Sequence, residues 1–133
     1  RTALSRVLLD TRLLLLWLKD DPRLPTSLVT ELQTGQHDVL ISQASLLEMA
    51  IKVNLGRMSV DLTVLEQEVP AEGFPWLPIS NEHLLEVAQL DTIEGHSVPF
   101  DRLLVAQCRV EPLLLSTCDQ ALQAYRACVR LIT

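Results

Sequence analysis

The chain has 133 residues, of which 48% are hydrophobic, and a formal net charge of −6. This length and apolar content predict one domain over residues 1–133 with a full core, and they exclude a disordered chain. The acidic balance argues against a generally basic surface for nucleic acid, so any action on nucleic acid would need a local site supplied with bound cations.

The first apolar stretch, residues 6–19 (RVLLDTRLLLLWLK), predicts a buried strand that leads directly into a buried helix. Its continuous apolar run, residues 13–18, is far shorter than the roughly 20 residues that span a membrane. It is also shorter than the apolar core of a signal peptide, about 7 to 15 residues. We therefore expect a cytoplasmic protein, with this stretch serving the core in preference to a partner surface.

Helices and strands alternate along the rest of the chain. Helices are predicted over 26–34, 43–56, 61–69, 81–90, 99–110 and 119–127, and strands over 38–42, 74–80, 112–117 and 128–133. Ser80 is expected to cap one helix, although His83 stands where a capping box would have an acid. The alternation predicts an α/β fold, a parallel sheet of about four to five strands with helices on both faces.

The cysteines and histidines give little indication of a site. The cysteines are odd in number and lack CxxC spacing, so we expect small buried thiols without disulfides or zinc at Cys108, Cys118 and Cys128. The histidines have no partner at ligand spacing and are interpreted as incidental surface or loop residues at His37, His83 and His96.

Four acids stand at positions that the predicted fold would bring together. Asp10 and Asp119 directly follow strands, Glu48 follows the strand 38–42 by about a turn, and Asp101 lies at a helix start. The carboxyl ends of parallel strands share one edge, where ligands bind. Two charges about 6 Å apart repel by roughly 3 kcal/mol at an effective dielectric of 20. Such a cluster would need protons or hard cations, and all-oxygen ligands suit Mg²⁺ or Mn²⁺.

The three aspartates also have ordinary structural explanations. Asp10 and Asp119 could cap the helices that follow them, and Asp101 could complement the dipole of its helix. For each aspartate taken singly, this is the preferred interpretation. Only the joint pattern favours a metal site.

Glu48 is open to two interpretations of equal weight. On a helix it falls within an apolar stripe formed by Ala44, Ile51 and Leu55, as the only charge there. It could instead form an ordinary ion pair with Lys52, four residues on.

The chain resembles PIN domains, and among them the VapC-type toxins of bacterial type II toxin–antitoxin modules. The matching blocks come in the family's order and cover nearly the whole chain: LLDTRLLLLWLKDDPRL, ISQASLLEMAIKVNLGRM, LPISNEHLLEVAQL, PFDRLLVAQ and LLLSTCDQAL. The resemblance places the family's four acids on Asp10, Glu48, Asp101 and Asp119. It also gives Thr117 as a hydroxyl that supports the metal site.

The resemblance implies a Mg²⁺- or Mn²⁺-dependent endoribonuclease, the toxin of a toxin–antitoxin module. Such an enzyme would hydrolyse RNA phosphodiester bonds with a metal-activated water and need no Ser, Cys or His nucleophile. A small antitoxin would mask the site, and toxin homodimers are common. Two alternatives are an inert PIN-like interaction module and, with less support, a phosphotransfer enzyme with Asp10 as nucleophile.

The chain departs from the family's pattern at two places. Arg12 replaces a frequent His, and it could contact RNA phosphate or, the slightly preferred role, cover its own helix. Ser97 and Val98 replace a frequent Arg-Asp pair, which puts in doubt any auxiliary metal or substrate contact there.

Overall fold

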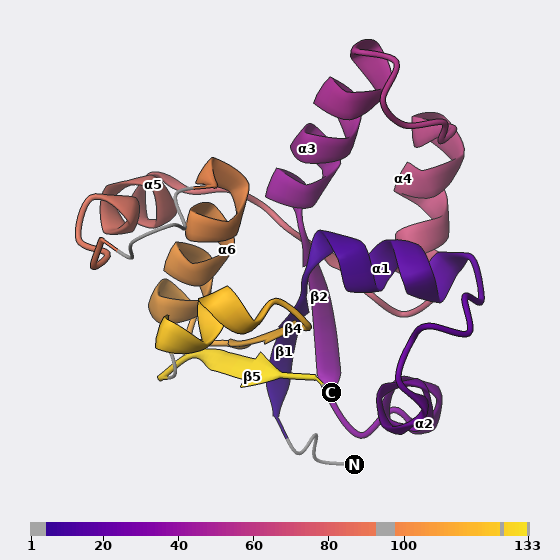
Figure 1. Ribbon diagram of the computed structural model, residues 1–133, viewed down its shortest axis with the longest axis horizontal. Helices are drawn as coiled ribbons and strands as arrows, with labels where there is room; N and C mark the ends of the chain where they lie inside the picture. The colour runs from indigo at the N-terminus through magenta and orange to yellow at the C-terminus, as the bar shows by residue number, and fades with distance from the viewer. Residues whose placement is uncertain (1–4, 93–97, 126, 133) are drawn as a thin grey trace.

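The structure is a computed structural model that describes residues 5–92, 98–125 and 127–132. A parallel sheet with connecting helices runs through it (Figure 1). The strands are β1 (Arg6–Leu9), β2 (Asp38–Ser42), β3 (Trp76–Leu77), β4 (Leu114–Thr117) and β5 (Val129–Leu131). The helices are α1 (Thr11–Leu18), α2 (Thr26–Thr34), α3 (Gln43–Asn54), α4 (Leu62–Ala71), α5 (Asn81–Val87), α6 (Pro99–Val110) and the 3₁₀ helix η1 (Gln120–Tyr125).

The five strands have the order β3-β2-β1-β4-β5, and all neighbours are parallel. β1 lies at the centre, where Val7 pairs with Val39 of β2 and with Leu114 of β4. Because every strand runs the same way, all carboxyl ends meet at one edge. The prediction of a parallel sheet with helices on both faces is confirmed.

Two apolar cores lie on opposite faces of this sheet. Leu8 and Leu9 are both 0% exposed, and they belong to different cores because successive strand residues point to opposite faces. α1, α2 and α4 pack on the Leu9 side, and α5, α6 and η1 pack on the Leu8 side (Figure 1). A strand covered on both faces is apolar along its covered part, which explains the unbroken run Val7, Leu8 and Leu9 after the exposed Arg6.

The aliphatic run 13–18 serves the core, as expected. Leu13, Leu14 and Leu16 are buried, and Trp17 packs against Phe74 with ring centroids 6.0 Å apart. Within the described ranges, no helix combines the length and the apolar character needed to cross a bilayer.

The apolar stripe expected on α3 is not a buried face. Leu47, Ile51 and Leu55 are 49%, 42% and 58% exposed, whereas Ala44 and Met49 are buried. The reason is visible in Figure 1, where α3 projects beyond the carboxyl edge of the sheet. Only part of its surface therefore meets either core.

Three predicted elements differ most from the structure in length or kind. The helix 81–90 ends at Val87, and the strand 74–80 is reduced to Trp76–Leu77. The segment 119–127, predicted as an α-helix, contains the 3₁₀ helix Gln120–Tyr125. A 3₁₀ helix rises about 2.0 Å per residue, more than an α-helix, and so spans a short crossover between two parallel strands with fewer residues.

His83 is a buried structural residue, so its interpretation as incidental was wrong. Its side chain is 2% exposed, and its Nδ1 accepts a hydrogen bond of 3.0 Å from the backbone N–H of Ser80. The His83 N–H donates in turn to Ser80 Oγ, which completes a capping box for α5 with His in the place of the acid. Since Nδ1 accepts, the ring proton sits on Nε2, which donates to Glu111 Oε2 at 2.6 Å.

Gln107 joins this box to the start of α3. Its side chain is 0% exposed, and its Oε1 accepts from Ser42 Oγ, the residue that caps α3. Its Nε2 donates to Pro78 O at 3.3 Å and lies 3.2 Å from His83 Nδ1. One amide therefore connects α6, α3 and the segment that leads into α5.

His96 lies outside the described residues.

We predict that Gln107→Leu destabilises the protein. The shape is nearly kept, but Ser42 Oγ and Pro78 O lose their partner, and each buried unsatisfied group costs about 1 to 3 kcal/mol. The exposed Gln33→Leu on α2 is the matched control and should change stability by less than about 0.5 kcal/mol. Urea unfolding monitored by circular dichroism measures both, and equal stability of the two variants would contradict the role given to Gln107.

Candidate active site

All four acids singled out in the sequence line one pocket at the carboxyl edge of the sheet. The pocket has a volume of about 340 Å³, and its other lining residues are Thr11, Arg12 and Cys118. The acids come from four separate segments: the β1–α1 junction (Asp10), α3 (Glu48), the first turn of α6 (Asp101) and the residue pair after β4 (Asp119). The parallel topology brings them together, as the sequence pattern predicted.

Asp10 is both a helix cap and a buried acid. Its Oδ1 accepts from the Leu13 N–H at 2.8 Å, which caps α1, and the residue is only 9% exposed. Burial raises the pKa of Asp10 from 3.8 to about 6, and the nearby charges of Asp101 and Asp119 push it in the same direction. Hydrogen bonds from Thr117 and Leu13 oppose the rise without cancelling it. Capping therefore accounts for the position of Asp10 but leaves a buried charge only partly compensated.

Glu48 forms the ion pair with Lys52 that its spacing allows, and it also accepts a hydrogen bond from Thr11. Its Oε2 lies 3.0 Å from Lys52 Nζ, and its Oε1 lies 2.9 Å from Thr11 Oγ1. Thr11 Oγ1 is also 2.7 Å from Ser45 Oγ. Since a carboxylate only accepts, the Thr11 hydroxyl donates to Glu48, and Ser45 completes the chain. Thr11 therefore orients the carboxylate of Glu48, which lines the same pocket as Asp10. No role was expected for Thr11, although it follows Asp10 directly in the sequence.

Asp119 and Asp10 are connected through Thr117. The buried Thr117 hydroxyl hydrogen-bonds Asp10 and accepts the Asp119 N–H at 3.0 Å. Asp119 itself is exposed, and its Oδ1 accepts from the Ala121 N–H at 3.0 Å, so it also caps η1. Thr117 thus contacts the site in the way expected of a supporting hydroxyl, while its role in metal binding stays a prediction.

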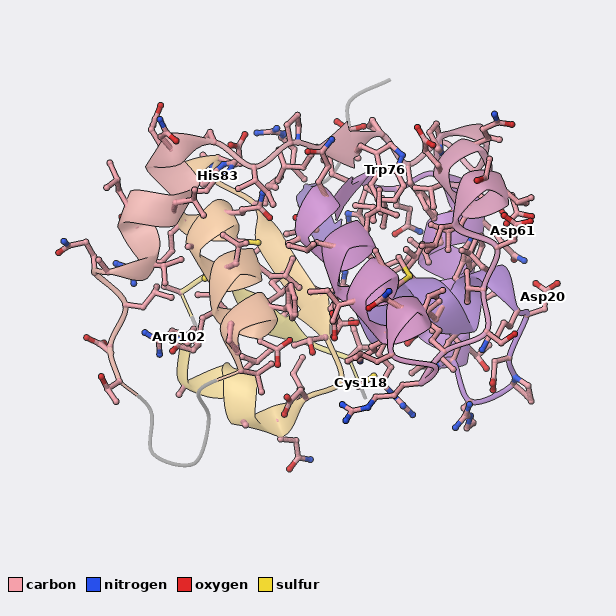
Figure 2. The ribbon with its side chains drawn as sticks, turned by 90° about the horizontal axis from the view of Figure 1, so that it is seen from above. Asp20, Asp61, Trp76, His83, Arg102 and Cys118 are labelled. Atoms are coloured by element: carbon pink, nitrogen blue, oxygen red, sulfur yellow. The ribbon has the colours of Figure 1, made fainter. Side chains whose placement is uncertain are left out.

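Cys118 and Arg12 also line this pocket. Cys118 is half-buried, unlike the buried Cys108 and Cys128, so the expectation of three buried cysteines was wrong for this one. Figure 2 shows Cys118 where the C-terminal part of the chain meets the N-terminal part. Burial, and then the charge of Asp10, raise the pKa of the Cys118 thiol, which keeps it uncharged and poorly nucleophilic. Arg12 is exposed at the pocket's rim.

The donor set of this pocket suits a hard divalent cation. Its carboxylates offer oxygen ligands only, and the charges of Asp101 and Asp119 add to the burial that raises the pKa of Asp10. Within the described ranges, no three His, Cys, Asp or Glu side chains lie close enough together to hold an ion. Mg²⁺ commonly binds proteins through one or two carboxylates and keeps several waters, so this spacing is compatible with the ion. Val98, which replaces a frequent acid of the family, is the residue before α6 and is 45% exposed.

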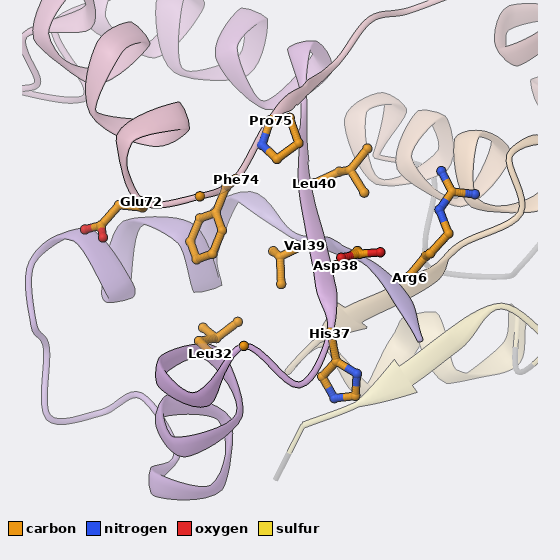
Figure 3. A pocket seen from close by; sticks show the side chains of 11 residues that line it. Arg6, Leu32, His37, Asp38, Val39, Leu40, Glu72, Phe74 and Pro75 are labelled. Atoms are coloured by element: carbon orange, nitrogen blue, oxygen red, sulfur yellow. The ribbon is translucent and has the colours of Figure 1, made fainter. Parts of the chain in front are cut away.

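Another pocket, of about 540 Å³, lies at the opposite edge of the sheet. Figure 3 shows it at the amino ends of β1 and β2, where Arg6, Asp38 and Phe74 line it. His37 lies there as well, held by Ser5 Oγ at 2.8 Å and by Glu31 at 3.5 Å. Two acids line this pocket, Asp38 and Glu72, and Figure 3 shows them apart from each other; ligands of open parallel sheets bind at the carboxyl edge instead.

Comparison with known proteins agrees with the fold. The model of the PIN domain family matches residues 7–127. The chain belongs to the PIN domain family. No curated protein is significantly similar to it in sequence.

Solved structures with a similar fold include three from different organisms. One is VapBC2 from Rickettsia felis bound to a DNA fragment from their promoter, with a TM-score of 0.69, 14% identity, and coverage of 96% of this chain and 99% of that chain. A toxin–antitoxin complex from Klebsiella pneumoniae has a TM-score of 0.64, 17% identity, and coverage of 93% and 95%. FitAcB from Neisseria gonorrhoeae has a TM-score of 0.62, 19% identity, and coverage of 92% and 95%. At these identities the likeness shows the fold.

We predict that Asp10→Asn stabilises the metal-free protein at high pH. The folded state holds the Asp10 proton up to a pKa of about 6, against 3.8 ordinarily. Stability from this group is therefore present below about pH 4 and is lost as the pH rises through about 6. Each pKa unit is worth about 1.4 kcal/mol, so ionised Asp10 destabilises the fold by about 3 kcal/mol, which Asn avoids.

Unfolding by urea at pH 4 and at pH 8, in the presence of a chelator, measures this difference. The gain from Asp10→Asn should be near zero at pH 4 and approach about 3 kcal/mol at pH 8. An equal effect at both pH values would show that Asp10 is not a buried, ionising group.

Proposed function

We propose that this PIN domain is a divalent-metal-dependent endoribonuclease and the toxin component of a toxin–antitoxin module. The observation that carries the proposal is the gathering of Asp10, Glu48, Asp101 and Asp119 in one pocket. Packing alone would not select such a group, because carboxylates brought together in a partly buried place repel one another. A bound cation would offset this repulsion.

One or two of the four carboxylates would bind Mg²⁺ or Mn²⁺ directly through oxygen, with waters completing the coordination and the other carboxylates adding negative charge nearby. A bound ion supplies Lewis acidity, which lowers the pKa of water and offsets charge on the phosphate and the leaving oxygen. Thr11 would keep Glu48 turned toward the pocket, and Thr117 would fix Asp10 relative to Asp119. The Cys118 thiol and the ring of His83 are unsuited to nucleophilic attack, the first by its raised pKa and the second by its burial away from the pocket.

Protein partners form the second part of the proposal. The FitAcB and VapBC2 structures and the Klebsiella pneumoniae toxin–antitoxin complex share the fold of this chain. On that basis we propose a cognate antitoxin that masks the pocket, and a homodimer. The exposed apolar residues Leu47, Ile51 and Leu55 on α3 support a protein contact next to the site, because contiguous apolar surface marks interaction regions.

We predict that the protein cleaves single-stranded RNA when Mg²⁺ or Mn²⁺ is present, and that Asp10→Asn abolishes cleavage. The substitution removes one oxygen charge from the ligand set while leaving a residue that still caps α1. Cleavage mapping on total RNA with both proteins side by side is the measurement. Asp61→Asn, at the cap of α4 and far from the pocket, is the matched control and should cleave as the wild type does. Cleavage by Asp10→Asn at the wild-type rate would refute the proposed mechanism.

We predict that Mn²⁺ stabilises the folded protein. At ten times its Kd, an ion that binds only the folded state contributes about 1.4 kcal/mol, a Tm rise of about 5 °C for a chain of this size. The Tm of Asp10→Asn should rise much less, measured from the Tm of that variant without Mn²⁺. The Tm of Asp61→Asn should rise as much as that of the wild type. Differential scanning fluorimetry with and without Mn²⁺ measures the shifts. No rise in the wild type would favour the inert interaction module.

A further inference from the structure

A pocket of opposite charge adjoins the acidic one. It has a volume of about 360 Å³ and is lined by four cations, Arg12, Lys19, Arg23 and Lys52. We call it the cationic pocket. Thr11, Arg12 and Glu48 line both pockets, so the two are continuous along the side of α1 that faces α3.

The concentration of positive charge here is unusual for this chain. The protein carries 11 Lys and Arg against 17 Asp and Glu, yet four of the 11 line this pocket. Glu48 is the one acid in its lining. A hollow lined by one sign of charge focuses the field and concentrates ligands of the opposite sign. The local potential is therefore positive beside a site whose own carboxylates would repel a phosphate.

The spacing of the cations fits a chain of phosphates better than a single anion. Arg12 and Lys19 are seven positions apart on the same side of α1, and so about 10 Å apart along its axis. In a helical strand, successive phosphates advance by about 3.4 Å along the axis. A strand lying along α1 could therefore meet Arg12 and Lys19 through different phosphates.

The cations are available for a ligand to different degrees. Lys52 is paired with Glu48, and Arg23 holds both carboxylate oxygens of Asp21, but their side chains are 44% and 67% exposed. Exposed pairs of this kind contribute little and exchange readily. Arg12 is exposed and makes no ion pair within the described part of the chain. Its guanidinium is suited to bidentate contact with a phosphate.

We infer that the cationic pocket binds the phosphates of a single RNA strand next to the bond to be cut, with Arg12 at the boundary between the two pockets. This inference rests on the proposed ribonuclease function and names where its substrate lies. It assigns Arg12 to substrate binding, whereas the sequence alone slightly favours a role in covering its own helix. An acidic segment of a protein partner is the competing ligand.

The test measures RNA binding without cleavage. Asp10→Asn serves as the parent protein, and the double variant Arg12→Gln/Lys19→Gln is made in it. Arg6→Gln/Arg57→Gln in the same parent is the matched control, since both of its arginines are exposed, neither lines either pocket at the carboxyl edge, and the net charge change is equal. Fluorescence anisotropy of a labelled single-stranded RNA of about 12 nucleotides gives Kd as a function of salt.

We expect the pocket variant to bind about 10- to 30-fold more weakly at about 0.1 M salt, because two phosphate contacts are lost. Its log–log salt slope should fall by about 1.4, or about 0.7 per contact. The control should change Kd by less than about threefold and keep most of its slope. Circular dichroism confirms that all three proteins are folded.

Three results would overturn the inference. The parent could fail to bind RNA, both double variants could weaken binding equally, or the pocket variant could lose binding to poly-L-glutamate while keeping RNA. The last result would assign the pocket to an acidic protein partner. Failure of the proposed function is seen separately: the wild type would then not cleave RNA with Mg²⁺ or Mn²⁺, even if Arg12 and Lys19 govern binding.

Discussion

The burial of Asp10 at the junction of β1 and α1 is the constraint on which the site depends. The residue is 9% exposed, two further aspartates stand close enough to raise its pKa, and two hydrogen bonds only partly compensate. A fold selected for stability alone would replace this residue with Asn or Ser, which cap helices equally well. An acid at this position is favourable when a bound cation compensates its charge.

The surrounding structure positions the other acids relative to Asp10. The parallel sheet brings the ends of β1, β2 and β4 to one edge, and short hydrogen bonds then orient individual groups. Thr11 connects α1 to Glu48, and Thr117 connects Asp10 to the backbone of Asp119. Farther in, Gln107 fixes α6 against the start of α3, the helices that carry Asp101 and Glu48. The Thr11, Thr117 and Gln107 groups bring no positive charge that would compete with a bound cation, whereas Lys52, which is paired with Glu48, does.

The distribution of charge divides this edge of the sheet into an acidic and a cationic pocket. In the roles proposed for them, the acidic pocket would bind a cation and the cationic pocket beside it would bind phosphate. This explains how a protein with net charge −6 could act on a polyanion without a generally basic surface. Because Thr11, Arg12 and Glu48 belong to both pockets, a change in one is expected to affect the other.

The sequence by itself determined the sheet, most element boundaries and the gathering of the four acids. Strand and helix periods are local properties, and the carboxyl ends of parallel strands must converge once the alternation is known. Only the tertiary structure decided that the stripe of Ile51 and Leu55 is exposed, since a period identifies residues that share a face but not what covers that face. It also decided that His83 is buried against Glu111 and that Lys19 and Lys52 border one pocket, because such contacts join segments whose packing no local pattern specifies.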